Sequence, residues 1–209
     1  MRDFICLIFA ILLVSCVGRK KDYTKDRVTG IDRYKIKIDS INALLEWKPL
    51  KEGLYISKNG DIGFKTVEMT EEGVSIDHYL KQLCCDGIKL KSVIDTASFE
   101  FMGSSFYRDK NNVYTHYDMA DGGNFWIVGA DVKTFEILGN CYARDKKHIY
   151  GERAMVMDSV DYASFRTSKA VGCFAKDKKG YLFWDERMTP EELLDESGDS
   201  LLLLELKKL

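Results

Sequence analysis

Three aspartates recur at similar spacing and are the first candidates for acid–base or metal chemistry. Asp109, Asp145 and Asp177 each precede a lysine, and they lie 36 and 32 residues apart (109 to 145, then 145 to 177). Paired carboxylates catalyse glycoside hydrolysis, and carboxylate oxygens bind cations. Their regular recurrence beside lysine favours a structural role instead, because a short carboxylate side chain can hydrogen-bond the backbone of its own turn.

A second set of aspartates precedes the first set in each repeat. These residues open three segments with the pattern Asp-x-x-Ser/Thr-Phe, namely Asp95–Phe99, Asp131–Phe135 and Asp161–Phe165. Such an aspartate can accept hydrogen bonds from the next free N–H groups and cap a single helical turn, with the phenylalanine as its buried anchor. We therefore expect all of these aspartates to be structural turn residues: Asp95, Asp109, Asp131, Asp145, Asp161 and Asp177.

The two motifs together define a unit that occurs three times. After the capped turn, each unit continues into a short strand and a β-hairpin, whose turns are Asp109–Asn112, Asp145–His148 and Asp177–Gly180. We expect the last residue of each turn to be left-handed, because Asn, His and Gly tolerate or favour positive φ. Repeats of this period bury their apolar faces on one another.

The predicted fold is mainly β with short helices, a β-rich α+β class. Tandem β-hairpin repeats, each with a helical turn, are expected over residues 93–188. Residues 31–92 are expected to form an N-terminal β-rich capping region, with a short helix over 41–47 and a hairpin over 54–64 that is either a degenerate repeat or a cap. Residues 189–209 are expected to cap the other end, starting with a helix whose N-cap is Thr189.

Other residues with catalytic or metal-binding potential do not form a recognisable pattern. The three histidines, His78, His116 and His148, share no metal-ligand spacing, and the adjacent pair Cys84–Cys85 lacks the spacing with which two thiolates reach one tetrahedral ion. We therefore predict no metal site, no cofactor and no catalytic residues. The formal net charge of −2 provides no electrostatic reason to expect nucleic acid as a partner.

Two cysteines occupy the same position in neighbouring repeats. Cys141 and Cys173 each lie four residues before the aspartate of the hairpin turn. Stacked units would place them in adjacent equivalent positions, where they could form a disulfide or remain small buried apolar residues.

The N-terminus has the features of a bacterial signal peptide over residues 1–15. Its apolar run, Phe4 to Val14, is too short to span a bilayer. The following motif, Leu13–Cys16, resembles the lipobox of bacterial lipoproteins, which implies cleavage before Cys16 and lipidation of that residue. An uncleaved anchor and a buried strand are the alternatives, but the polar composition after Cys16 favours a solvated tether over residues 16–30. The absence of acidic residues directly after Cys16 favours the periplasm-facing side of the membrane.

The repeats resemble the DKNYY family of bacterial proteins, whose units carry an Asp-x-x-Thr-Phe turn and a Tyr-Ala-Lys-Asp-Lys-Asn hairpin. The second copy is most similar, through Asp131–Phe135 and Tyr142–Lys146, whereas only the first copy keeps the asparagine, at Asn111. This resemblance implies a repeated structural motif and no enzymatic mechanism.

These features predict a membrane-anchored envelope lipoprotein of unknown biochemical activity. We expect a non-enzymatic binding or scaffold module whose partner is a protein or a glycan, and the alternative is a hydrolase of cell-wall or glycan material. Aromatic residues in or near the hairpins are core residues by default, although a subset exposed on one face would form a binding strip. They are Tyr107, Tyr114, Tyr117, Phe125, Trp126, Tyr150, Tyr181, Phe183 and Trp184.

Overall fold

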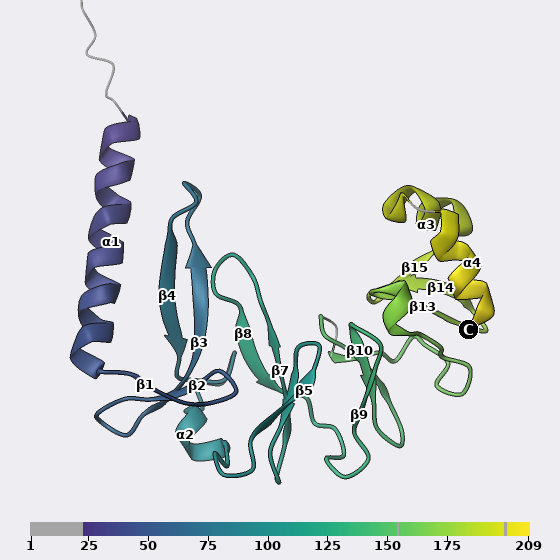
Figure 1. Ribbon diagram of the computed structural model, residues 1–209, viewed down its shortest axis with the longest axis horizontal. Coiled ribbons are helices and arrows are strands. Elements are labelled where there is room, and N and C mark those ends of the chain that lie inside the picture. Colours follow the sequence, from purple (N-terminus) through teal and green to yellow (C-terminus); the bar gives the residue numbers. More distant parts are fainter. Residues whose placement is uncertain (1–22, 154, 199) are drawn as a thin grey trace, which may run out of the picture.

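The computed structural model of the protein describes residues 23–153, 155–198 and 200–209. Four antiparallel sheets follow one another along an arc (Figure 1). The long helix α1 (Tyr23–Leu45) stands at one end of the arc, and the short helices α3 (Pro190–Ser197) and α4 (Ser200–Lys208) cover the other end. The mainly β architecture with short helices confirms the predicted fold class.

Each sheet pairs strands that are consecutive in sequence, as expected for hairpin repeats. The first sheet contains β1 (Lys48–Lys51), β2 (Leu54–Ile56), β3 (Ile62–Met69) and β4 (Ser75–Leu80). The second contains β5 (Glu100–Gly103), β6 (Phe106–Arg108), β7 (Val113–Tyr117) and β8 (Asn124–Ile127). The third contains β9 (Glu136–Leu138), β10 (Tyr142–Arg144), β11 (Ile149–Gly151) and β12 (Met155–Val156). The fourth contains β13 (Phe174–Asp177), β14 (Gly180–Phe183) and β15 (Glu186–Met188). Two short helical segments lie between sheets in the sequence: α2 (Leu90–Val93) and the 3₁₀ helix Lys169–Val171.

The first sheet has the same strand order as the second, and β1 pairs with β2 in the same way as β5 pairs with β6. A register shift separates Pro49 from Lys51 in β1, and an equivalent shift separates Phe101 from Gly103 in β5. The buried Ser57 stands at the start of the β2–β3 turn, and its Oγ accepts a hydrogen bond from the Asp61 N–H at 3.1 Å. The hairpin of residues 54–64 is therefore built like a repeat, with a serine where the other units carry an aspartate.

Helix α1 is much longer than the helix expected over residues 41–47, and it begins inside the segment expected to be a tether. It lies beside β4, where the Asn42 side-chain amide donates to the Asp77 carbonyl at 2.9 Å and Tyr34 donates to Glu68 at 2.9 Å. An ion pair between Lys35 and Asp39, one turn apart, also supports the helix. Across the described ranges, no helix combines the length and apolar character needed to cross a membrane.

The hydrophobic core is divided into clusters that lie between successive sheets. The phenylalanines that end the Asp-x-x-Ser/Thr-Phe motifs, Phe99, Phe135 and Phe165, are all buried. Phe135, for example, packs with Phe106 of the second sheet and Tyr150 of the third. Each unit is thus stabilised mainly by burial against its neighbours rather than by a core of its own.

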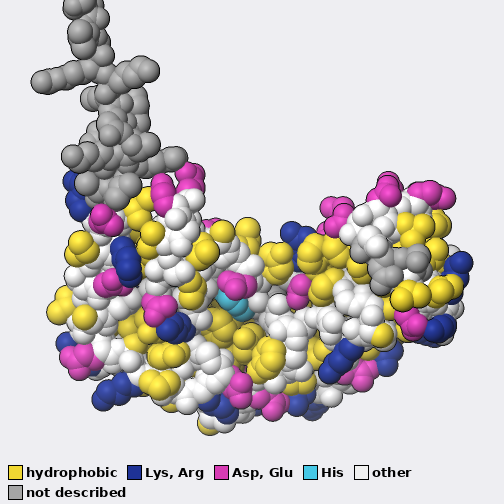
Figure 2. Space-filling model, turned by 45° about the horizontal axis from the view of Figure 1, so that its top comes forward, with side chains coloured by type: hydrophobic (Ala, Val, Ile, Leu, Met, Phe, Trp, Pro, Cys, Tyr) yellow, Lys and Arg dark blue, Asp and Glu magenta, His cyan; other side chains and the backbone are white. Residues whose placement is uncertain are grey.

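The C-terminal helices close the open end of the last sheet. Helix α3 begins with the predicted capping box: the Thr189 hydroxyl accepts from the Glu192 N–H at 3.2 Å, and the Glu192 carboxylate accepts from the Thr189 N–H at 2.8 Å. Leu193 of α3 and Leu206 of α4 are fully buried against Val171. Figure 2, which tilts the inner side of the arc forward, shows hydrophobic and charged side chains interspersed along the hollow between the two ends.

Phe135 provides a test of packing between sheets. We expect Phe135→Ala to lower the free energy of unfolding by about 3–5 kcal/mol, because it removes buried aromatic surface and leaves a cavity. The matched control is Phe101→Ala, since Phe101 is 46 % exposed, and its cost should be about 1 kcal/mol or less. Urea unfolding of both variants measures the difference, and equal costs would contradict the assignment of Phe135 to the inter-sheet core.

Candidate functional site

The repeated aspartates form a hydrogen-bonded clamp, which we describe first in the second copy. Asp145 is almost fully buried, and its Oδ1 accepts from the N–H groups of Lys147 and His148, both at 2.8 Å. Its Oδ2 accepts from the Asp131 N–H at 3.0 Å and from the Tyr150 hydroxyl at 2.9 Å. Both carboxylate oxygens are therefore occupied by groups of the protein.

The second aspartate of the clamp holds the preceding turn. Asp131 Oδ1 accepts from the N–H groups of Lys133 at 3.0 Å and Thr134 at 3.2 Å, and its Oδ2 pairs with the Lys146 ammonium group. The Thr134 hydroxyl in turn accepts from the Lys146 N–H at 3.2 Å. The two turns are thus joined at several points, which explains why the two motifs occur together in the sequence.

The other two copies repeat this arrangement. In the first copy, Asp109 accepts from the Asp95 N–H at 2.7 Å and from the Tyr114 hydroxyl at 2.8 Å. In the third copy, Asp177 accepts from the Asp161 N–H at 2.7 Å, but leucine replaces the tyrosine. The Arg187 guanidinium takes over there and donates to both oxygens of Asp177, at 2.6 and 2.7 Å.

The expectation of a left-handed residue at the end of each hairpin turn is correct only at Gly180, where φ is +127°. Asn112 and His148 do not have positive φ. Their N–H groups instead donate to the side chain of the aspartate that opens the turn, both at 2.8 Å. The aspartate therefore closes these two turns without a left-handed residue.

Hydrogen bonding controls the ionisation of Asp145. Burial disfavours its charged form, but the N–H groups of Asp131, Lys147 and His148, together with the Tyr150 hydroxyl, outweigh burial and lower its pKa to about 2. The pKa of Asp177 is also lowered to about 2, with burial opposing and Arg187 favouring the carboxylate. Such groups stay ionised at neutral pH and suit a structural role rather than proton transfer.

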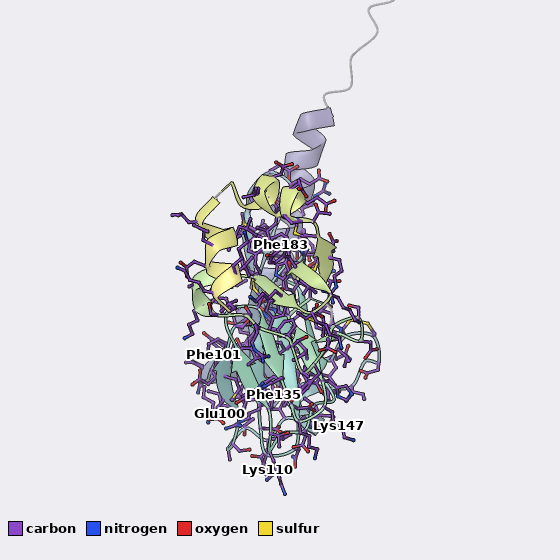
Figure 3. All side chains as sticks on the ribbon, turned by 90° about the vertical axis from the view of Figure 1, so that its right-hand side faces the viewer. Glu100, Phe101, Lys110, Phe135, Lys147 and Phe183 are labelled. Atoms are coloured by element: carbon purple, nitrogen blue, oxygen red, sulfur yellow. A yellow bond between two sulfur atoms is a disulfide. The ribbon has the colours of Figure 1, made fainter. Side chains whose placement is uncertain are left out.

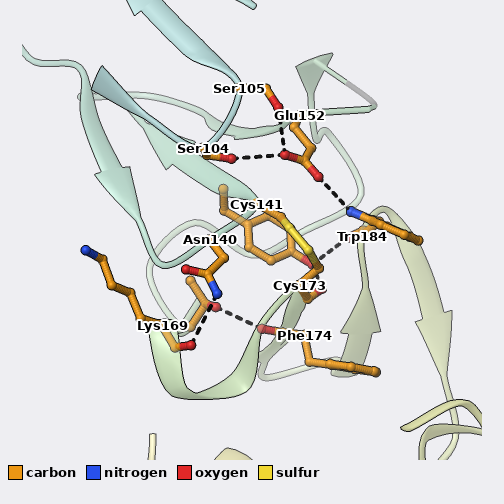
Figure 4. The surroundings of a disulfide bond; sticks show 11 residues. Ser104, Ser105, Asn140, Cys141, Glu152, Lys169, Cys173, Phe174 and Trp184 are labelled. Atoms are coloured by element: carbon orange, nitrogen blue, oxygen red, sulfur yellow. Dashed lines mark hydrogen bonds between the residues drawn. A yellow bond between two sulfur atoms is a disulfide. The ribbon is translucent and has the colours of Figure 1, made fainter. Parts of the chain in front are cut away.

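The structure joins Cys141 and Cys173 in a disulfide between the second and third repeats, which form the third and fourth sheets (Figure 4). Their Cα atoms are 5.0 Å apart, within the usual range for a bridge. The Glu152 carboxylate lies close by, so that the three residues together have potential metal-ligand atoms within 4.8 Å of one another. Metal binding requires thiolates, so the disulfide and a metal ion would exclude each other. A second disulfide joins the adjacent residues Cys84 and Cys85.

Glu152 connects three consecutive sheets. One of its oxygens accepts from the hydroxyls of Ser104 at 3.0 Å and Ser105 at 2.9 Å, in the turn between β5 and β6. Its other oxygen accepts from the Trp184 indole N–H at 3.0 Å, just after β14 (Figure 4). Glu152 follows β11 directly, so this network fixes neighbouring units relative to one another.

An exposed arginine lies over two aromatic rings next to this network. The Arg153 guanidinium carbon is 4.1 Å from the centroid of the Trp184 ring and 5.2 Å from that of Tyr117. A small cavity of about 150 Å³ adjoins Arg153, Phe183 and Trp184. We call Tyr117, Glu152, Arg153 and Trp184 the Arg153 cluster, and it is the candidate binding surface.

The repeated motifs agree with a known protein family. The model of the DKNYY family matches residues 62–186, from β3 to β15, which is more than half of the chain. The chain belongs to the DKNYY family. Comparisons with curated proteins and with solved structures found no match. The family match begins upstream of the expected boundary at residue 93 and includes the β3–β4 hairpin, in agreement with the repeat-like strand order of the first sheet.

The aromatic residues of the DKNYY repeats divide between the core and the surface. Tyr114, Phe125 and Tyr150 are buried, whereas the other six noted in the sequence are partly exposed: Tyr107, Tyr117, Trp126, Tyr181, Phe183 and Trp184. In Figure 3, Phe183 lies towards the inner side of the arc, and the turn lysines Lys110 and Lys147 lie at the opposite, outer side.

Sequence reasoning did not single out Glu152 or Arg153. Aligning the three repeats of this chain with one another gives a signal for Glu152. His116, Glu152 and Trp184 each lie seven residues after the turn aspartate of their unit. Equivalent positions of stacked units lie near one another. Residues that differ between copies at one such position are therefore candidates for a role outside the repeat itself.

Asp145 tests the clamp. We expect Asp145→Ala to lower the free energy of unfolding by at least about 1.5 kcal/mol at neutral pH, because it leaves buried N–H groups without a partner. Asp145→Asn should cost less, since its amide oxygen can still accept. The control is Asp158→Ala at an exposed position, with little expected change.

The same variants have a defined pH dependence. Because the folded pKa of Asp145 is about 2, below its ordinary value of 3.8, the unfolded chain takes up its proton first as pH falls. Its contribution to stability is present above pH 4 and is lost between about pH 4 and about pH 2. Urea unfolding across this window should therefore show a smaller acid-induced loss for Asp145→Asn than for the parent. An unchanged pH dependence would contradict the clamp.

Proposed function

We propose that this DKNYY protein is a bacterial envelope lipoprotein that is anchored to the membrane through Cys16 and acts as a non-enzymatic binding module. The match of Leu13–Cys16 to a lipobox supports the anchor. Residues 1–15 and Cys16 lie outside the described residues, so this part of the proposal rests on sequence alone. It includes a periplasm-facing location, because basic rather than acidic residues follow Cys16 closely.

The observation that carries the non-enzymatic role is the complete use of the repeated carboxylates within the clamps. Asp109 and Asp145 are buried and accept hydrogen bonds from N–H groups and from a tyrosine hydroxyl, and Asp177 is held by Arg187. A catalytic carboxylate must instead reach the substrate directly or through one water molecule. The repeats therefore act as a scaffold, and their recurring acidic residues do not favour a hydrolase.

The Arg153 cluster is the surface that we propose for partner binding. Arginine, tryptophan and tyrosine are enriched among the residues that contribute most to binding energy, because they combine large contact area with polar groups. Arg153 is exposed and presents its guanidinium between two aromatic rings. The hydrogen bonds of Glu152 to neighbouring sheets keep these groups in place, which lowers the entropic cost of binding. Helix α1 would span roughly 35 Å at 1.5 Å per residue and could separate this surface from the anchor.

The anchor is tested by mass spectrometry of the mature protein from a bacterial membrane. We expect Cys16 to be the N-terminal residue and to carry lipid, and Cys16→Ala to block both lipidation and signal removal by the lipoprotein route. Cys6→Ala is the matched control and should leave the mature protein unchanged, since Cys6 lies in the segment expected to be removed. An unmodified mature N-terminus elsewhere in residues 1–30 would refute the anchor.

The binding role is tested by cross-linking and capture of partners from the native envelope. We expect Arg153→Ala to reduce the captured partner about tenfold, as for loss of a contact worth about 1.4 kcal/mol. Lys147→Ala, on the outer side of the arc, should have no effect. Glycan staining and protein mass spectrometry distinguish the two kinds of partner. Equal capture by all three proteins would refute the surface, and turnover of purified cell-wall material would favour the hydrolase.

A further inference from the structure

A cavity separate from the Arg153 cluster lies beside the first sheet. It has a volume of about 470 Å³, which is within the range that holds small ligands. Its lining comes from the β2–β3 turn, the end of β4, the segment that follows β4 and the start of β8. It therefore lies between two consecutive units, where residues from distant parts of the sequence meet.

Three lysines line this cavity: Lys81, Lys89 and Lys91. Lys91 forms an ion pair with Asp61 at 2.7 Å, which neutralises one positive charge. Within the part of the chain that the structure describes, no acidic side chain forms an ion pair with Lys81 or Lys89. The cavity consequently has a positive lining in a protein whose formal net charge is −2.

The charges of all three lysines that line the cavity act on the Asp61 carboxyl group. The hydrogen bond from Lys91 lowers the pKa of the Asp61 carboxyl, and the charges of Lys89 and Lys81 lower it further. An anionic group placed between these lysines would experience the same favourable field.

A closed loop holds two of the lysines in position. The Leu90 N–H donates to the Lys81 carbonyl at 2.9 Å, and the Leu83 N–H donates to the Ile88 carbonyl at 2.8 Å, so residues 81–90 return on themselves. The loop is tied to the second sheet because the Cys84 N–H donates to the Phe125 carbonyl at 2.8 Å. The backbone that carries Lys81 and Lys89 is therefore anchored at both of its ends.

The remaining lining determines which kind of anion would fit. Tyr79 contributes aromatic surface, and Asn124, whose side-chain amide can donate and accept hydrogen bonds, also lines the cavity. The Tyr79 ring is stacked on Trp47, with ring centroids 4.5 Å apart, and is thereby fixed. A ligand with one anionic group and a hydroxyl-bearing ring would match this combination of charge, amide and aromatic surface.

We propose that this cavity is a binding site for a small anionic sugar. The phosphate or carboxylate of the ligand lies between Lys81 and Lys89, and its ring lies against Tyr79 with its hydroxyls towards Asn124. Lysine is suited to this role because its ammonium group binds phosphate and carboxylate as a compact point charge. The site does not depend on the membrane anchor or on the Arg153 cluster. The proposal of a sugar site can therefore fail without the proposed function failing, and the reverse also holds.

The test is isothermal titration of the full-length protein, purified in detergent, with glucose 6-phosphate and glucuronate as probes. We expect both to bind, glucose to bind much more weakly, and binding to weaken as salt concentration rises. The double variant Lys81→Gln/Lys89→Gln should lose at least about tenfold in affinity. The matched control is Lys133→Gln/Lys147→Gln, which removes two exposed lysines from the second repeat.

Other results would overturn either the site or the role of the sugar ring. Absence of binding by both anionic sugars, or equal loss in the two double variants, overturns the site. Inorganic phosphate that binds as tightly as glucose 6-phosphate overturns the role of the sugar ring. Thermal unfolding of the double variants is the check on folding; because all four lysines are exposed, we expect melting temperatures close to that of the parent. If Lys81→Gln/Lys89→Gln does not fold, Tyr79→Leu provides a second test through its effect on the ratio of affinities for glucose 6-phosphate and inorganic phosphate.

Discussion

The structure depends on a buried carboxylate that accepts hydrogen bonds from two separate backbone turns. Asp145 binds the N–H groups of its own hairpin turn and also that of Asp131, which opens the preceding turn. Since short strands and single helical turns are not stable alone, this cross-connection determines where the anchoring Phe135 enters the space between sheets. The charged Asp145 carboxylate is stable in a buried position because N–H donors surround it.

The clamp changes towards the ends of the array, as expected for terminal repeats. Ser57 replaces the aspartate in the first sheet, and the guanidinium of Arg187 replaces the tyrosine hydroxyl in the last unit. The geometry is therefore conserved within the molecule more strongly than the residue types. The ends of the array are covered by different elements, namely α1 beside β4 and the pair α3 and α4 beyond β14.

Both surfaces that we propose for binding lie where consecutive units meet. Arg153 contacts rings from two other sheets, and the lysine-lined cavity combines the segment after β4 with the start of β8. The clamp residues occupy the hairpin turns, and their hydrogen-bonding capacity is used there. Positions outside the clamp can differ between copies without loss of the fold, and this freedom allows a repeat scaffold to acquire specific sites.

The sequence by itself determined the repeat, the position of each hairpin turn and the capping box at Thr189, because these depend on interactions between residues close in sequence or on a recurring pattern. It left open whether Cys141 and Cys173 are bonded, and it did not indicate that α1 begins at Tyr23, because that helix has no clear apolar stripe. Only the tertiary structure brings together the residues of the Arg153 cluster and those of the cavity near Lys81. Their residues come from different units, and the distances between them depend on how the sheets pack together rather than on any local preference.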